Sequence, residues 1–137
     1  MKMRNIEIER IINILNDRTC FRFDNKVKQP PRIRFAIRSN LDKLVAAYNT
    51  YDAARKEMIQ GYVEEGIVSQ GEDGNYMIKD GCIDKVNHEL SDLNNIETDI
   101  DFVLIDKNEM DSFLQTVSMS TPEEDVLLLF VRGEENG

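Results

Sequence analysis

The chain has 137 residues, of which 41% are hydrophobic and 31% charged, and its formal net charge is −9. This length predicts a single domain over residues 1–137, with enough apolar side chains for a modest core. The longest uninterrupted apolar run, residues 126–131, is far shorter than the ~20 residues of a membrane-spanning helix, so we expect no membrane partner.

The first half of the chain predicts two helices. Residues 5–17 carry apolar side chains on one helical face, and Asn5 is a candidate N-cap for this helix. A basic loop, residues 18–29, lacks any periodicity and ends at two prolines. A much longer helix over about 32–62 follows, because its apolar residues recur at a spacing of three to four. It is ~46 Å long at 1.5 Å per residue, so its apolar stripe requires a partner helix or a second subunit.

The second half predicts shorter elements. Residues 67–78 have the pattern of a hairpin around a glycine-rich turn, and residues 82–94 predict a helix that lies antiparallel to the long one. Residues 96–105 alternate apolar and acidic, which is typical of an amphipathic strand. A capping box that starts at Thr121 predicts a last, buried helix over 122–131. The fold class is α+β and helix-dominated: a long central helix packed with shorter helices and a small antiparallel sheet.

Charge is unevenly distributed along the chain. Residues 1–60 hold 13 Lys and Arg against 7 Asp and Glu, whereas residues 61–137 hold 4 against 19. The halves either attract one another, within a subunit or across a dimer, or serve different partners. The acidic half repels phosphates, so duplex nucleic acid is an unfavourable partner.

Basic and aromatic residues gather around the start of the long helix. Backbone N–H groups at a helix start favour anions, and Arg34 and Arg38 stand one turn apart, where they can bind one phosphate or carboxylate. The candidate ligand site, for a small anionic nucleotide, consists of Arg22, Lys28, Arg32, Arg34, Phe35 and Arg38. The alternative is that these arginines pair with the acidic strand, in the same or a neighbouring subunit.

Candidate interface residues lie on the long helix and on the predicted strand. Tyr48 and Tyr51 belong to the apolar stripe, and Glu97, Asp99 and Asp101 form the acidic face of the strand. Alternating carboxylates of this kind are typical of a solvated outer face, so we expect no metal there.

Motifs of enzymes are missing from the sequence. The single histidine, His88, lies off the apolar face of its predicted helix, and Cys20 and Cys82 have no metal or redox spacing. We therefore expect no catalytic residue, no cofactor and two free thiols. The N-terminal residues lack the apolar stretch of a secretory signal, so we expect a cytoplasmic protein.

The run Pro31-Arg-Ile-Arg-Phe-Ala-Ile-Arg-Ser-Asn-Leu41 resembles the pattern Pro-hydrophobic-basic-aromatic-Ala-Ile-x-x-Asn-hydrophobic. That pattern marks an uncharacterised family of small proteins encoded by phages and prophages of Firmicutes. The order of the segments MKMRNIEI, YMIKD, NNIETDIDFVLI and STPEEDVLLLFV is similar to that family too. The resemblance implies an accessory phage protein of the host cytoplasm, from a class rich in inhibitors of host defence.

Three hypotheses follow from these features. The first is a non-enzymatic inhibitor of a bacterial antiviral defence system, which binds a host protein through its acidic surface. The second is an oligomeric sponge that sequesters an anionic nucleotide signal at Arg34 and Arg38. The third is a structural or assembly protein whose long helix pairs with itself. We expect a homo-oligomer.

Overall fold

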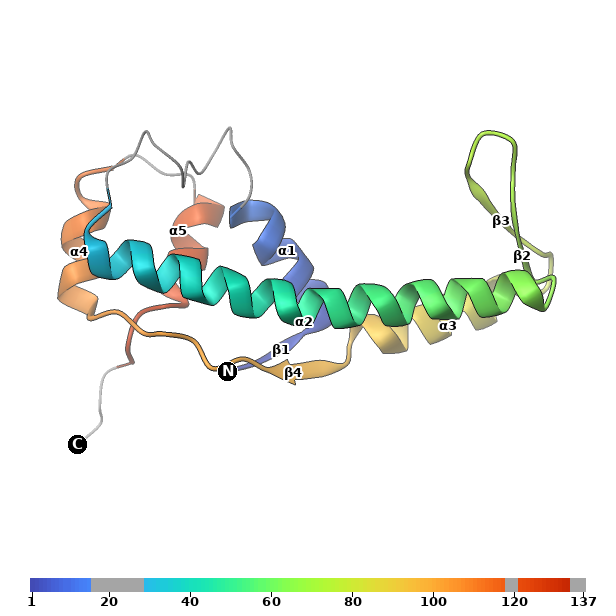
Figure 1. Cartoon of the computed structure of the whole chain (residues 1–137), viewed down its shortest axis with the longest axis horizontal. Helices are drawn as coiled ribbons and strands as arrows, with labels where there is room; N and C mark the ends of the chain where they lie inside the picture. Colours follow the sequence, from blue (N-terminus) through green and yellow to red (C-terminus); the bar gives the residue numbers. More distant parts are fainter. Residues whose placement is uncertain (16–28, 118–120, 134–137) are drawn as a thin grey trace.

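The computed structural model of the chain describes residues 1–15, 29–117 and 121–133 (Figure 1). It is α+β and helix-dominated, as the sequence predicts, with a long central helix, shorter helices and two separate two-stranded antiparallel sheets. Its elements in chain order are β1 (Lys2–Arg4), α1 (Asn5–Leu15), α2 (Pro31–Glu64), β2 (Val68–Gln70), β3 (Tyr76–Ile78), α3 (Ile83–Asn94), β4 (Glu97–Asp99), α4 (Lys107–Leu114) and α5 (Thr121–Leu128).

The long helix α2 is unbroken over 34 residues, which makes it about 51 Å long. It starts with Pro31 at its first position, where the missing N–H costs no hydrogen bond. It ends in a Schellman motif, in which Gly66 has φ +76° and Ile67 N–H donates to the Tyr62 carbonyl at 2.9 Å. The predicted helix over 32–62 is confirmed.

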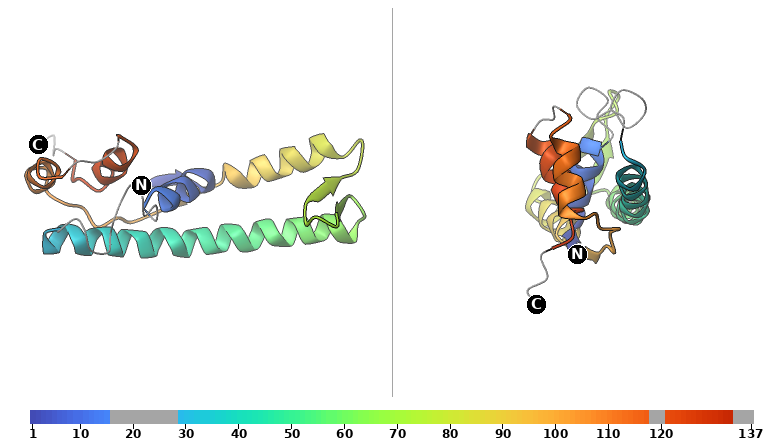
Figure 2. Two further views of the ribbon diagram at one scale, coloured as in Figure 1. Left: turned by 90° about the horizontal axis from the view of Figure 1, so that it is seen from above. Right: turned by 90° about the vertical axis from the view of Figure 1, so that its left-hand side faces the viewer.

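The main hydrophobic cluster covers the first half of α2. Helices α1, α4 and α5 pack there, on one side of α2 (Figures 1 and 2). Ile33, Ile37 and Leu44 supply the α2 side of this cluster and are fully buried. The 3–4 spacing of these residues is what turns one face of the helix toward the core.

The extended segment that begins at β4 packs against this cluster through Ile100, Phe102 and Ile105. β4 pairs antiparallel with β1, with Met3 opposite Thr98. The pairing of the two strands ends at Asp99, so the prediction of a strand over 96–105 is wrong beyond that residue. The partner strand β1 has only three residues, and beyond it the chain is held by Ile100 N–H, which donates to the Met1 carbonyl at 2.9 Å.

The second half of α2 carries a separate, smaller cluster. The last turns of α2, the β2–β3 hairpin and α3 form a projection that we call the arm, residues 58–94 (Figure 1). Tyr62, Val68 and Val86 are its buried residues. The Tyr62 hydroxyl donates to the Glu89 carboxylate, and this link joins α2 to α3. The predicted hairpin and the antiparallel helix are therefore both present.

The described part of the C-terminal region contains two helices, of which only the second was predicted. Helix α4 has no counterpart in the prediction, while α5 begins at Thr121, one residue before the predicted start. The basic loop 18–29 lies outside the described residues, apart from Gln29. Among the helices of the described ranges, none combines the length and the apolar character needed to cross a membrane.

Candidate functional site

The predicted ligand residues diverge around the first turns of α2. Arg34 and Arg38 are both exposed and lie one turn apart, and Arg38 forms an ion pair with Asp42 at 3.3 Å. Arg32 instead lines a cavity on another side of the helix, and Phe35 lies between that cavity and the face of Arg34 and Arg38. Arg22 and Lys28 lie outside the described residues. The nucleotide site at Arg34 and Arg38 stays a prediction, on an open helix face.

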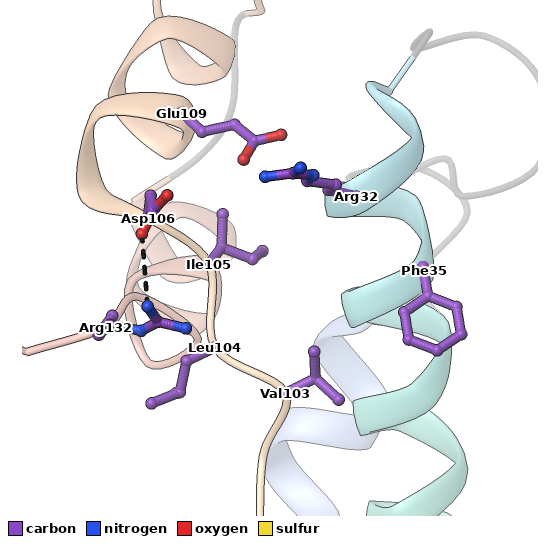
Figure 3. A pocket seen from close by; sticks show the side chains of 8 residues that line it. All are labelled: Arg32, Phe35, Val103, Leu104, Ile105, Asp106, Glu109 and Arg132. Carbon is purple, nitrogen blue, oxygen red and sulfur yellow. Dashed lines mark ion pairs between the residues drawn. The ribbon is translucent and has the colours of Figure 1, made fainter.

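The cavity beside Arg32 has a volume of about 270 Å³ and lies between α2 and the segment that leads into α4 (Figure 3). The guanidinium of Arg32 points toward the carboxylate of Glu109 across the opening, whereas Phe35 is turned away along α2. The remaining wall consists of Val103, Leu104, Ile105, Asp106 and Arg132.

A short parallel bridge builds the far wall of this cavity. Ile105 N–H donates to the Phe130 carbonyl at 2.7 Å, and Arg132 N–H donates to the Ile105 carbonyl at 2.8 Å. The bridge places Arg132 beside Asp106, with which it forms an ion pair at 3.8 Å. Two guanidinium groups and two carboxylates therefore line the cavity with balanced charge. Because the two carboxylates repel a phosphate, a molecule that carries both signs of charge fits this cavity better.

The acidic face of the predicted strand is partly occupied by the chain's own N-terminus. The terminal ammonium group forms an ion pair with Asp99 at 3.0 Å. The Lys43 ammonium group donates to the backbone carbonyl of Asp101, and Glu97 lies opposite Arg4 in the sheet. Glu97, Asp99 and Asp101 are exposed. Among the described residues, no ion pair joins this face to Arg34 or Arg38 within one chain, and the alternative of a pairing between two subunits stays a prediction.

The two predicted interface tyrosines lie inside the chain's own packing. Tyr51 is only 4% exposed, and its hydroxyl donates to the Asn94 side chain at the end of α3. Burial raises the pKa of Tyr51, and the Arg55 guanidinium lies 5.1 Å from its ring centroid. Tyr48 is half-buried and makes an edge contact with Tyr51, with centroids 6.1 Å apart. Tyr51 therefore joins α2 to α3 and offers no surface to a partner.

The sequence predicted the elements of the arm but did not single out the arm as a candidate site. Its residues hold two lysines against eight carboxylates, a net charge of −6. Tyr76, Met77 and Ile83 are 55%, 64% and 46% exposed on it. Tyr76 and Met77 come from the predicted hairpin, where the alternation of a strand requires one of two neighbouring apolar residues to face away from the core. The sequence therefore signalled the exposure of one of these two residues and not of both.

The candidate functional site is thus the acidic arm, with four exposed large apolar side chains, Val63, Tyr76, Met77 and Ile83, among carboxylates.

In the described part of the chain, no group of three or more histidine, cysteine, aspartate or glutamate side chains could hold a metal ion. His88 is exposed on α3, where Asp92 lies 3.5 Å away. Comparison of the chain with protein-family models, curated proteins and solved structures gives no match.

Proposed function

We propose that the chain is a non-enzymatic accessory protein of a phage or prophage, and that it inhibits a bacterial antiviral defence system by binding a host protein. The acidic arm is the contact surface, and the host protein presents a basic surface to it. The phage origin is supported by the resemblance of residues 31–41 to the family pattern.

The observation that carries this proposal is the exposure of Tyr76, Met77 and Ile83 on a projection of net charge −6. Protein interfaces combine an apolar centre with a polar rim, and tyrosine and methionine are enriched in them. The carboxylates of the arm attract a positively charged partner and speed the encounter. The arm also projects beyond the main cluster, so a partner reaches it without displacing other elements (Figure 1).

Phage plating on bacteria that carry a defence system tests the function directly. Expression of the chain is expected to restore plaques, and the double variant Tyr76→Ser with Met77→Ser is expected to lose this effect. The matched control is Leu104→Ser with Leu128→Ser, which alters two apolar side chains of similar exposure, 43% and 46%, away from the arm. An arm variant that protects phage as well as the wild type contradicts the proposal.

Binding to the purified host protein tests the charge argument. Contacts between exposed charges weaken as salt screens them, with a Debye length of about 10 Å at 0.1 M. The dissociation constant is therefore expected to rise steeply with salt. Replacing Glu72, Asp80 and Asp92 by their amides is expected to flatten that dependence, while amides at Asp101, Asp111 and Glu124 leave it unchanged. Affinity that is independent of salt argues against the arm as the contact surface.

A further inference from the structure

One long face of α2 has no partner within the described part of the chain. The other elements lie on the opposite side of this helix (Figure 2). Exposed side chains recur on this face at a spacing of three to four over its whole length, and we call them the open face. They are Arg34, Phe35, Arg38, Asp42, Ala46, Asn49, Ala53, Lys56, Gln60, Val63 and Glu64.

The two ends of the open face carry opposite charge. Arg34 and Arg38 lie at the start, and Glu64 lies at the end. Each end also exposes one large apolar side chain, because Phe35 is 66% exposed and Val63 is 37% exposed. A stripe with this polarity is complementary to its own reversed copy and repels a copy that runs in the same direction.

We propose that the open face binds a second copy of the chain, with the two α2 helices antiparallel and Asn49 on the two-fold axis. Such an isologous contact places residues equally distant from Asn49 at the same level along the helix pair. Arg34 of one copy then lies level with Glu64 of the other, and Phe35 lies level with Val63.

The centre of the open face agrees with the same register. Asp42 of one copy lies level with Lys56 of the other, and each already has an ion pair within its own helix, Arg38–Asp42 at 3.3 Å and Lys56–Asp52 at 2.9 Å. The antiparallel register therefore joins two pairs of alternating charge into a network across the contact. Small side chains around Asn49 allow the helix axes to approach to about 8 Å.

The size of the contact sets its strength. The stripe from Arg34 to Glu64 is about 45 Å long, and a helix is about 10 Å wide, so each copy contributes an area of about 450 Å². This is the size of a transient rather than a permanent interface. We expect a reversible dimer whose dissociation constant is micromolar, with the two arms at opposite ends.

Cysteine cross-linking tests the register. In a chain whose Cys20 and Cys82 are replaced by serine, Asn49→Cys is expected to form a disulfide-linked dimer on mild oxidation. Phe35→Cys is the matched control, because two copies of residue 35 are about 42 Å apart in the antiparallel dimer. Its failure to cross-link is expected. Equal cross-linking of both variants indicates a parallel pair, and no cross-linking of either overturns the proposal.

Charge reversal tests the recognition by a second readout, sedimentation equilibrium across a micromolar concentration series. Arg34→Glu is expected to weaken dimerisation about tenfold or more, because it places like charges level with one another. Arg34→Glu with Glu64→Arg restores the complementarity and is expected to recover most of the affinity. A wild-type chain that is monomeric throughout, or a double variant weaker than the single one, overturns the proposal. Both variants leave Tyr76 and Met77 unchanged, and Arg34→Glu alone also leaves the charge of the arm unchanged, so failure of dimerisation is distinguishable from failure of the arm in the plating assay.

Discussion

The side-chain amide of Asn40 forms two hydrogen bonds with the backbone of Val103: its Oδ1 accepts from the Val103 N–H at 2.7 Å, and its Nδ2 donates to the Val103 carbonyl at 3.0 Å. Asn40 is fully buried in the first half of α2. Its amide thus takes the place of a neighbouring strand for a segment that has left the β1–β4 sheet. It also fixes the wall of the cavity beside Arg32.

Asn40→Ala is expected to lower the free energy of unfolding by about 2–4 kcal/mol, since it leaves buried backbone groups unpaired and opens a small cavity. Chemical denaturation followed by circular dichroism measures the loss. The control is Asn87→Ala, which changes an exposed asparagine on α3 and is expected to stay within about 0.5 kcal/mol of the wild type. Equal effects of the two variants argue against the role of the Val103 contacts.

Two glycines near the end of α2 are expected to respond to alanine with opposite signs. Gly61 lies within the helix, and an added Cβ meets nothing within 4 Å, so Gly61→Ala is expected to stabilise the chain by about 0.5–1 kcal/mol. Gly66 has φ +76°, where a Cβ costs roughly 1–2 kcal/mol, so Gly66→Ala is expected to destabilise it. Denaturation midpoints decide, and a change of the same sign in both variants contradicts this reasoning.

Alkaline pH is expected to loosen the arm. Burial raises the pKa of Tyr62 to about 12, with the hydrogen bond to the Glu89 carboxylate as the second cause, whereas an unfolded chain has a tyrosine pKa of ~10. A raised pKa favours the folded state below the unfolded value, so this stabilisation is complete below pH ~10 and is lost as pH rises toward 12. The free energy of unfolding, measured against pH, is expected to fall less in Tyr62→Phe.

The tyrosinate absorbance gives the matching measurement. Glu89→Gln removes the negative charge but keeps an oxygen that can accept the Tyr62 hydroxyl, so it is expected to lower the pKa of Tyr62 toward the usual value. An unchanged titration in this variant shows that burial alone is responsible.

The stability of the parallel bridge in the far wall of the cavity is expected to depend on Ile105 and not on the ion pair between Arg132 and Asp106. Arg132 and Asp106 are more than half exposed, so Arg132→Ala is expected to change the free energy of unfolding by less than about 1 kcal/mol. Ile105 is 3% exposed in the main cluster, and Ile105→Ala is expected to cost about 2–5 kcal/mol. Thermal denaturation of both variants provides the comparison. A larger loss in Arg132→Ala is the contrary outcome.

The long helix was predictable because its periodicity runs over many turns, from Ile37 to Tyr62, and two prolines mark its start. Helix α4 escaped prediction because it has eight residues and only two buried ones, Met110 and Phe113. A pattern so short cannot be distinguished from a loop by periodicity alone.

The strand over 96–105 failed for a different reason. Its alternation predicts Ile96 and Leu104 on the buried side, but these are 53% and 43% exposed, and Ile105 is buried in place of Leu104. The bridge between Ile105 and Val131 turns Ile105 toward the core, so the buried position moves by one residue from the one that the alternation predicts. That shift depends on a contact between segments far apart in the sequence, as does the division of α2 between two clusters, so local pattern cannot reveal either.

The two halves of α2 pack in hydrophobic clusters of unequal size, and this difference affects how the native state opens locally. Among the described residues, eighteen buried ones form the cluster on its first half, whereas three buried ones form the cluster of the arm. Free energies of local opening follow the buried contacts of each cooperative unit. Amides of the arm therefore exchange with solvent deuterium through fluctuations that leave the larger unit intact, and protection along this one uninterrupted helix declines from its first half toward its last turns.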